Sequence, residues 1–279
     1  AWRWMFGVGV IPSLLFLLGI LVLPESPGWL VAKERHSEAE VALSRIGNSM
    51  YVSETMDGIK KALSRSRGGK FSLLFSKVYL PVVTIGVVLA MFQQLCGINV
   101  VFNYTSNIFE SIGASKDDQL LQTVFIGGVN LVFTLFAMML VDRVGRRPLM
   151  LAGSGGLFIL YMIIAYFLAI KSALVAVFLL LAIGLFATTL APVTWVLISE
   201  IFPSGIRVAA SSFAVLCLWF AYFITIFTFP LLQKAIGTDN TFYIYSAVCF
   251  LGFVFIGLKV KETNGRSLDE MDALFSVHG

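Results

Sequence analysis

Seven uncharged, apolar stretches, each about long enough to cross a bilayer, set the strongest limit on how this chain folds. A transmembrane helix needs about 20 mostly apolar residues, because a bilayer has no water to satisfy exposed backbone groups. Charged residues make up 13% of the chain, about half the share that a soluble domain carries. We therefore expect an all-α integral membrane protein with spans at roughly these positions: 4–23, 78–109, 119–141, 148–170, 172–199, 208–233 and 240–258.

The distribution of positive charge predicts how these spans are oriented. Of the 20 lysines and arginines, 16 fall in connections on one side of the membrane, and four fall on the other: Arg3, Lys116, Lys171 and Lys234. Cytoplasmic loops carry the excess of positive charge. We expect the protein in the plasma or inner membrane of the cell, with its N-terminus outside and its C-terminus in the cytoplasm. The net charge of +4 then reflects orientation in a lipid bilayer, and no nucleic-acid partner is expected.

The spans predict four parts: a first helix at 1–23, a cytoplasmic linker at 24–77, a six-helix bundle at 78–260 and a cytoplasmic tail at 261–279. Short helices are expected in the linker. Ser37-Glu38-Ala39-Glu40 fits a capping box, and a second helix would gather its apolar residues on one face: Val52, Met56, Ile59 and Leu63. A solvated linker and a clamp on the bundle fit this pattern equally well.

The six later spans form two groups of three, and the first span of each group is interrupted. Gly97 lies within 78–109, and Gly184 and Pro192 lie within 172–199. Interrupted helices at corresponding positions of two repeats are typical of the binding sites of transporters. We therefore predict a break at each place and a polar site beside them.

The first interrupted span carries several polar side chains at mid-depth: Gln93, Gln94, Asn99, Asn103 and Tyr104. Such groups are unfavourable in a membrane unless they meet partners or line a wet cavity. Amides donate and accept hydrogen bonds without carrying charge, which suits a neutral, hydroxyl-rich solute better than an ion. The alternative is that these side chains form hydrogen bonds between helices. This interpretation is favoured more for Asn130 in the next span.

Aromatic residues of later spans suggest a surface for a sugar ring. Phe186 and Trp195 lie in the second interrupted span, with Trp195 nearer its middle than its end, and Trp219 lies in 208–233. An aromatic face can stack on the apolar face of a sugar, and an indole N–H can donate a hydrogen bond. The alternatives are a tryptophan at the membrane interface for Trp195 and core packing for Trp219.

Acidic and basic residues stand together at the cytoplasmic ends of several spans: Glu25, Asp142, Arg143, Arg146, Glu200 and Arg207. If these residues only anchored the helices, arginines without acidic partners would be enough. The acidic residues beside them favour ion pairs that hold spans together in one conformation and separate in another.

Catalysis, metal binding and ATP hydrolysis are not expected. The only histidines, His36 and His278, lie outside the spans, and Gly69-Lys70 lacks the preceding glycine of a P-loop. No nucleophile–base pair or metal set falls at membrane depth, so we predict no enzymatic activity, no metal and no cofactor. The sequence Gly153-Ser154-Gly155-Gly156 favours close packing between helices.

Five motifs, in this order, resemble those of the sugar porter family of the major facilitator superfamily. QQLCGIN at 93–99 is similar to the QQxxGxN of the seventh helix, DRVGRR at 142–147 to the loop between helices eight and nine, and PVTWVLISEIFPSGIR at 192–207 to the tenth helix. PESPGWL and KETNGRSL resemble the family's PESPRWL and PETKGxSL. The resemblance covers residues 1 to about 275. It implies a major facilitator-type bundle, in which these seven transmembrane helices are the sixth to twelfth of a twelve-helix fold and the N-terminal half is a partner.

The resemblance also implies a function: transport of a monosaccharide, a hexose or pentose, by alternating access as a secondary transporter or facilitator. Gln93, Gln94, Asn99, Tyr104 and Asn130 would bind the sugar, and Phe186, Trp195 and Trp219 would line its pocket. The charged residues at the cytoplasmic ends would stabilise the outward-open state. A polyol carrier, for example for inositol, and a sugar sensor that moves no solute are the alternatives. Proton symport and facilitated diffusion both stay open, because the acidic residue of proton-linked members lies in the other half.

Several positions depart from the family's pattern. Asn103 stands where its tyrosine pair begins, and Ala191 replaces the glycine before the tenth-helix proline. Leu218 and Tyr222 stand where many members carry amides near the eleventh-helix tryptophan. We expect these changes to affect the outer gate and the choice of sugar rather than the class of substrate.

Overall fold

The computed structural model describes residues 7–66, 71–111, 116–203 and 205–262, with the side chains of 62–66, 111, 116–123 and 142 outside the description. All regular structure within these ranges is helical. Contacts between residues divide the chain into two units, Ala1–Gly68 and Gly69–Gly279.

The described part of the first unit contains an apolar helix, α2 (Val10–Val22), followed by α3 (Pro27–Ala32), α4 (His36–Ser44) and α5 (Ser49–Ser66). Every side chain of α2 is exposed. Helices α3, α4 and α5 share a small core: Leu30, Val31, Ala39, Ala42, Leu43 and Met56. Val52 and Ile59 pack against it, which confirms the predicted apolar face of α5 for the side chains that are described.

The predicted capping box at Ser37 is wrong. A cap at Ser37 would place the first helical residue at Glu38, but α4 begins two residues earlier, at His36, and no side chain caps it. In the first turn, Glu38 pairs with Arg35, whose Nε and Nη2 donate to its two carboxylate oxygens at 2.7 and 2.6 Å, a bidentate charged pair. This guanidinium lowers the pKa of the Glu38 carboxyl from its ordinary value.

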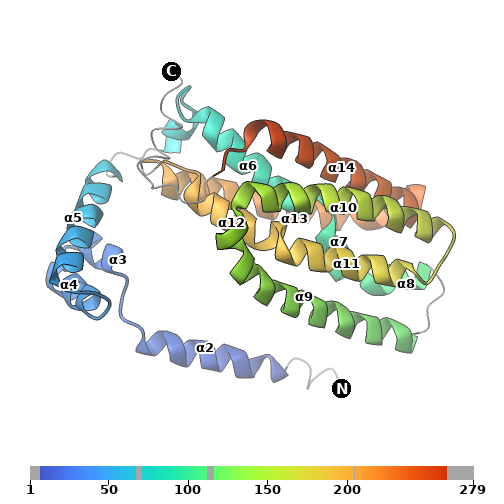
Figure 1. The fold of residues 1–279 in the computed structure, drawn as a ribbon, viewed down its shortest axis with the longest axis horizontal. Helices are drawn as coiled ribbons and strands as arrows, with labels where there is room; N and C mark the ends of the chain where they lie inside the picture. The colour runs from blue at the N-terminus through green and yellow to red at the C-terminus, as the bar shows by residue number, and fades with distance from the viewer. Residues whose placement is uncertain (1–6, 67–70, 112–115, 204, 263–279) are drawn as a thin grey trace. The chain divides into compact units, whose positions relative to one another are not determined.

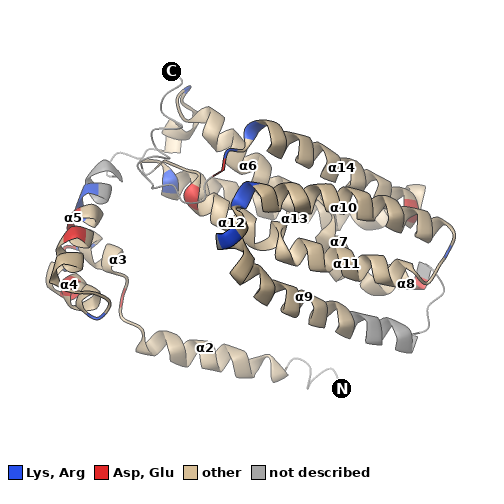
Figure 2. Cartoon of the chain, viewed as in Figure 1, with Lys and Arg blue, Asp and Glu red and all other residues tan. Residues whose placement is uncertain are grey.

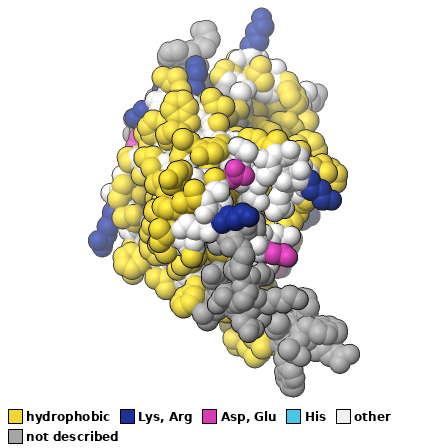
Figure 3. Space-filling model, turned by 90° about the vertical axis from the view of Figure 1, so that its right-hand side faces the viewer, with side chains coloured by type: hydrophobic (Ala, Val, Ile, Leu, Met, Phe, Trp, Pro, Cys, Tyr) yellow, Lys and Arg dark blue, Asp and Glu magenta, His cyan; other side chains and the backbone are white. Residues whose placement is uncertain are grey.

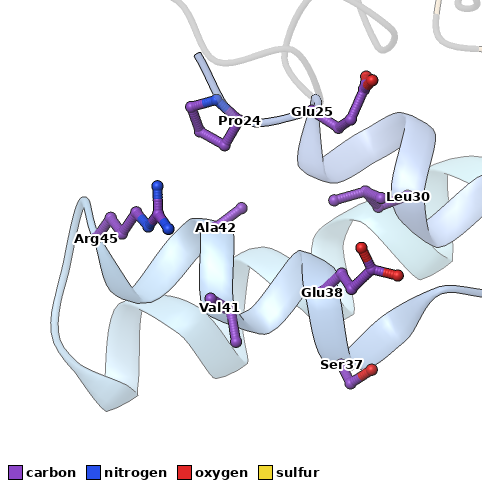
Figure 4. Close-up of a pocket in the computed structure, with 8 residues that line it drawn as sticks. All are labelled: Pro24, Glu25, Leu30, Ser37, Glu38, Val41, Ala42 and Arg45. Carbon is purple, nitrogen blue, oxygen red and sulfur yellow. The ribbon is translucent and has the colours of Figure 1, made fainter. Parts of the chain in front are cut away.

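A hollow of about 340 Å³ opens beside α4 (Figure 4). Its lining residues come from α3, from α4 and from the residues next to these helices: Pro24, Glu25, Leu30, Ser37, Glu38, Val41, Ala42 and Arg45. Leu30 and Ala42 are buried, whereas Glu25, Glu38 and Arg45 are exposed. The hollow therefore has an apolar floor and a charged rim.

The second unit begins with a short 3-10 helix, η1 (Phe71–Phe75), and continues with α-helices: α6 (Leu80–Leu95), α7 (Ile98–Asn103), α8 (Thr105–Ser111), α9 (Lys116–Val144), α10 (Arg146–Ala169), α11 (Val175–Thr188), α12 (Leu190–Glu200), α13 (Arg207–Ile236) and α14 (Thr238–Lys259). Within the described residues, they provide six spans that are long and apolar enough to cross a membrane. Residues 4–6 of the predicted first span lie outside the description, and α2 is its described part.

Two long helix pairs form the frame of this unit: α10 lies along α14, and α13 lies along α6 (Figure 1). The span Leu80–Asn103 is the most buried, at 61%, whereas Arg207–Ile236 is 22% buried and Val124–Val141 17%. Viewed from the right-hand end of Figure 1, the described surface is mostly hydrophobic with scattered charges (Figure 3). The interrupted helix with the polar side chains is thus held at the centre of the unit.

The break predicted at Gly97 is confirmed. α6 ends at Leu95 and α7 begins at Ile98, with Gly97 between them at a φ of +83°. A Cβ at this position would lie 2.5 Å from Cγ of Tyr245 on α14. Glycine is therefore needed both for the left-handed backbone and for the close approach of the tyrosine ring.

The second break lies at Thr189, and the prediction at Gly184 is wrong. α11 continues through Gly184 to Thr188, and α12 starts at Leu190. Pro192 is the cause, because it has no N–H for the Thr188 carbonyl four residues earlier and its ring displaces that carbonyl. Gly184 has a packing role instead, since a Cβ there would lie 3.2 Å from the ring of Phe133 on α9.

The predicted close packing at Gly153-Ser154-Gly155-Gly156 is confirmed. A Cβ at Gly153 would overlap the side chain of Thr189, and one at Gly156 would overlap Leu185. On the other side of α10, a Cβ at Gly155 would lie 3.2 Å from the ring of Phe253. These glycines let α10 approach both the second break and α14.

Candidate functional site

Three amides form a chain of hydrogen bonds around the first break. Asn99 Nδ2 donates to Gln94 Oε1, and Gln94 Nε2 donates to Gln93 Oε1 at 3.3 Å. Gln93 Nε2 donates in turn to the backbone carbonyl of Ala191 on α12, also at 3.3 Å. Gln93 and Gln94 are buried, at 4% and 7% exposure. The amides therefore join the two interrupted spans.

Trp195 lies on the α12 side of this amide chain. It follows Ala191 by four residues, so both lie on one face of the helix. Trp195 keeps 46% of its surface exposed, whereas Phe186 of α11 is 7% exposed and belongs to the hydrophobic core. The contact from Gln93 to Ala191 therefore places the amides beside the face that carries an accessible indole.

Helix α13 lies on the other side. The hydroxyl of Tyr104 donates to the Ile226 carbonyl at 3.1 Å, and Thr225 Oγ1 lies 3.5 Å from the carbonyl oxygen of Gln94. Trp219 precedes Ile226 by seven residues, which puts it on the same face of α13, and it is 54% exposed. The amide chain thus lies between two helices that each carry an exposed tryptophan.

Asn130 is placed apart from this chain. Phe133, three residues later on α9, packs against Gly184 of α11, so Asn130 lies on the face of α9 that meets α11. Asn130 is half-buried, and its amide makes no hydrogen bond to the described residues. Of the predicted sugar-binding residues, the structure joins Gln93, Gln94 and Asn99 directly, and sets Tyr104, Trp195 and Trp219 around them.

A cluster of charges closes one end of the second unit, where basic residues of α9, α10 and α14 gather (Figure 2). The buried Arg146 forms an ion pair with Glu200 of α12, with Nη2 and Oε1 3.2 Å apart. Its Nη1 donates to the Val141 carbonyl of α9 at 3.2 Å. The carboxylate of Glu262, after α14, accepts from the backbone N–H groups of Arg146 and Arg147 at 3.0 and 3.1 Å. This charge cluster joins four helices.

The other predicted members of the charge network are placed differently. Arg207 donates from Nε to the Phe202 carbonyl at 2.9 Å. Arg143 is exposed, and Glu25 lies in the first unit, on the rim of the hollow there. The side chain of Asp142 lies outside the description. The structure therefore brings together Arg146 and Glu200 from the predicted set.

Sequence reasoning missed Glu262, although a signal was present. Glu262 lies in KETNGRSL, a motif that already counted toward the resemblance, and it stands shortly after a span beside Lys259 and Lys261, as Glu25, Asp142 and Glu200 stand at the ends of other spans. Its partners Arg146 and Arg147 lie 116 and 115 residues earlier. Only the packing of α10 along α14 brings them together.

Comparison with known proteins decides the family. The profile of the family described as "Sugar (and other) transporter" matches residues 1–275. The chain belongs to this family. It is 37% identical to the D-xylose-proton symporter of Escherichia coli K12 over 284 residues, which are 98% of this chain and 57% of that protein. It is 35% identical to the glucose facilitated diffusion protein of Zymomonas mobilis, with 98% and 59% of the two chains covered.

Solved structures agree with this assignment to the sugar transporters. A major facilitator superfamily proton:xylose symporter, XylE, bound to 6-bromo-6-deoxy-D-glucose, aligns at a TM-score of 0.84 and 36% identity, covering 98% of this chain and 59% of that one. The inward-open form of XylE from E. coli aligns at a TM-score of 0.74. The predicted fold class is confirmed, and this family consists of membrane transporters rather than enzymes. The chain spans less than two thirds of the length of these relatives.

Proposed function

We propose that this chain supplies one wall of the binding site of a monosaccharide transporter that works by alternating access. The observation that carries the proposal is the chain of amides from Asn99 to Ala191, set between two exposed tryptophans. In the described spans, acidic and basic residues occur only in the terminal turns. A wall with donors, acceptors and aromatic faces but no charge fits a neutral polyhydroxylated ring.

The proposed binding residues are Gln93, Gln94, Asn99, Tyr104, Asn130, Phe186, Trp195 and Trp219. The amides would bond to sugar hydroxyls, and Trp195 would stack on the ring. A transporter must release what it binds, so we expect an affinity in the micromolar to millimolar range, or about 4–8 kcal/mol. The relatives named as xylose and glucose transporters support a pentose or hexose as substrate.

The charge cluster would hold the cytoplasmic ends of the helices in one of the two access states. Arg146, Glu200 and Glu262 connect α9, α10, α12 and the end of α14. Glu25, Asp142, Arg143 and Arg207 would join this network in the whole transporter. The excess of Lys and Arg at this end supports its placement in the cytoplasm, with the N-terminus outside, the linker 24–77 and tail 261–279 inside, and the six-helix bundle 78–260 between them.

Counterflow of labelled D-xylose and D-glucose into proteoliposomes that hold the full-length transporter tests the proposal. We expect exchange of at least one of the two sugars, and no exchange of it by empty liposomes. Net uptake into a second set of vesicles with an imposed pH gradient, measured with and without a protonophore, distinguishes proton symport, which needs the gradient, from facilitated diffusion, which does not. Binding of sugar without any exchange would support a sensor, and exchange of inositol alone would support a polyol carrier; either result would overturn the proposal.

A further inference from the structure

Asn103 and Tyr222 form a contact between the broken helix and α13. Asn103 is the last residue of α7, and its Nδ2 lies 3.3 Å from the hydroxyl of Tyr222. The same Nδ2 donates to the carbonyl of Asn99, one turn earlier, at 2.8 Å. The pair therefore adjoins the amide chain, although neither residue belongs to the proposed set of binding residues.

The backbone fixes which way the Asn103 amide faces. The carbonyl oxygen of Asn99 can only accept a hydrogen bond, so the NH₂ group of Asn103 must face it. Both amide hydrogens are then used, one by Asn99 and one by Tyr222. The amide oxygen of Asn103 remains available as an acceptor. Because the Tyr222 oxygen accepts from Asn103, its own O–H is available as a donor.

The surroundings of the pair are suited to a ligand. Tyr222 and Tyr104 line a hollow of about 480 Å³ together with residues of α13: Phe223, Ile226, Phe227, Pro230 and Leu231. The Tyr222 ring also meets Trp219 edge-on, with the centroids 5.7 Å apart. Asn103 is exposed and Tyr222 is half-buried. The available acceptor and donor therefore stand at the border between the amide chain and an aromatic hollow.

We propose that Asn103 and Tyr222 are a specificity-determining pair, which presents one acceptor and one donor to the sugar on the α7–α13 side of the site. This inference rests on the proposed transport of a monosaccharide. It also explains two departures from the family's pattern together. The family's pattern has a tyrosine at position 103 and an amide near Trp219, whereas here the amide lies on α7 and the tyrosine on α13, and the two are in contact.

A double-mutant cycle in the full-length transporter tests the pair. The variants are N103A, Y222F and N103A/Y222F, and the readout is the ratio of the KM values for D-glucose and D-xylose, which differ by one hydroxymethyl group. We expect each single variant to change this ratio by about three- to tenfold in the same direction, as for one hydrogen bond. The double variant should change it by less than the product of the two single effects, because each residue holds the other in place.

The reciprocal exchange N103Y/Y222N restores a tyrosine–amide pair and should move the ratio back toward the wild-type value. N240A is a matched control, since Asn240 donates to the carbonyl of Ile236 at 2.8 Å in the same way, and it lies on α14. Y243F is the control for Y222F, because Tyr243 is an exposed tyrosine of α14. Both controls should leave the ratio unchanged.

Two results would overturn the inference while the proposed function stands. In one, the wild type moves both sugars and the effects of N103A and Y222F multiply in the double variant. In the other, the variants change the KM for both sugars equally, which indicates a structural role. A wild-type transporter that exchanges no monosaccharide would overturn the proposed function, and this inference with it.

Discussion

Glu262 caps the helix that Arg146 begins. Its carboxylate accepts hydrogen bonds from the first two backbone N–H groups of α10, which have no partner within the helix. Negative charge at a helix N-terminus is also favoured by the helix dipole. Gly145, at a φ of +98°, leaves room for this carboxylate, because a Cβ there would lie 2.9 Å from Glu262 Oε2.

Replacement of Glu262 by alanine should lower the stability of the transporter. The loss of a helix cap is expected to lower the free energy of unfolding by about 1 kcal/mol, and Glu262→Gln should have a smaller effect because an amide oxygen still accepts. Thermal unfolding in detergent measures the change. Glu110→Ala, at an exposed glutamate of α8, is the control. Equal melting temperatures for E262A and E110A would contradict the role of the cap.

Gly97→Ala should be strongly destabilising. The left-handed backbone at φ +83° and the Tyr245 ring 2.5 Å from the new Cβ each act against it, and together they should lower stability by about 2 kcal/mol or more. Gly127→Ala on α9 is the control, since no heavy atom lies within 4 Å of its Cβ. The double variant G97A/Y245A should regain only the part of the loss that comes from the ring. Retention of wild-type stability by G97A would show that the break does not require glycine.

Trp195→Ala should weaken sugar binding and leave stability nearly unchanged. The indole is 46% exposed, so its removal leaves little cavity, whereas the loss of aromatic stacking should raise the Kd by about tenfold. Calorimetric titration of the full-length transporter with sugar gives the Kd. Trp29→Ala is the control, because Trp29 is 44% exposed and lies in the first unit. If both variants bind sugar as tightly as the wild type, Trp195 is not part of the site.

Gly153→Ala tests the contact between α10 and the second break. The added methyl group would overlap the side chain of Thr189, and such overpacking lowers stability by about 1–3 kcal/mol. Gly128→Ala adds the same group where no heavy atom lies within 4 Å. Thermal unfolding of the two variants should therefore separate them clearly. A similar melting temperature for both would mean that α10 can move away from Thr189 without loss.

Features that depend on local sequence could be predicted. Long apolar stretches mark the spans, since the bilayer sets their length, and Gly97 marks a break, since glycine alone adopts that backbone conformation readily. The apolar face of α5 follows from helical periodicity. The amides at Gln93, Gln94 and Asn99 could be recognised as a polar site because polar groups are rare at that depth.

Features that depend on long-range contacts could not be predicted. The pairing of Gln93 with Ala191 joins residues that are 98 positions apart, and that of Asn103 with Tyr222 joins residues 119 apart.

The break at Thr189 lies three residues before Pro192, because proline acts on the carbonyl of the preceding turn. At Ser37, the local pattern predicted a cap, but α4 begins at His36, so Ser37 lies within its first turn and no side chain caps the helix.

The hydrogen bond from Gln93 ends on the backbone carbonyl of Ala191 rather than on a side chain. Every amino acid supplies that carbonyl, so substitution of Ala191 alone does not remove the acceptor. The resemblance to the sugar porters implies a glycine at this position, where this chain has Ala191. Evolution can thus vary the side chain at this position, and with it the shape of the site, while the two interrupted helices stay joined. Selection for a new sugar can therefore change the side chain at position 191 without loss of the hydrogen bond that joins the two helices.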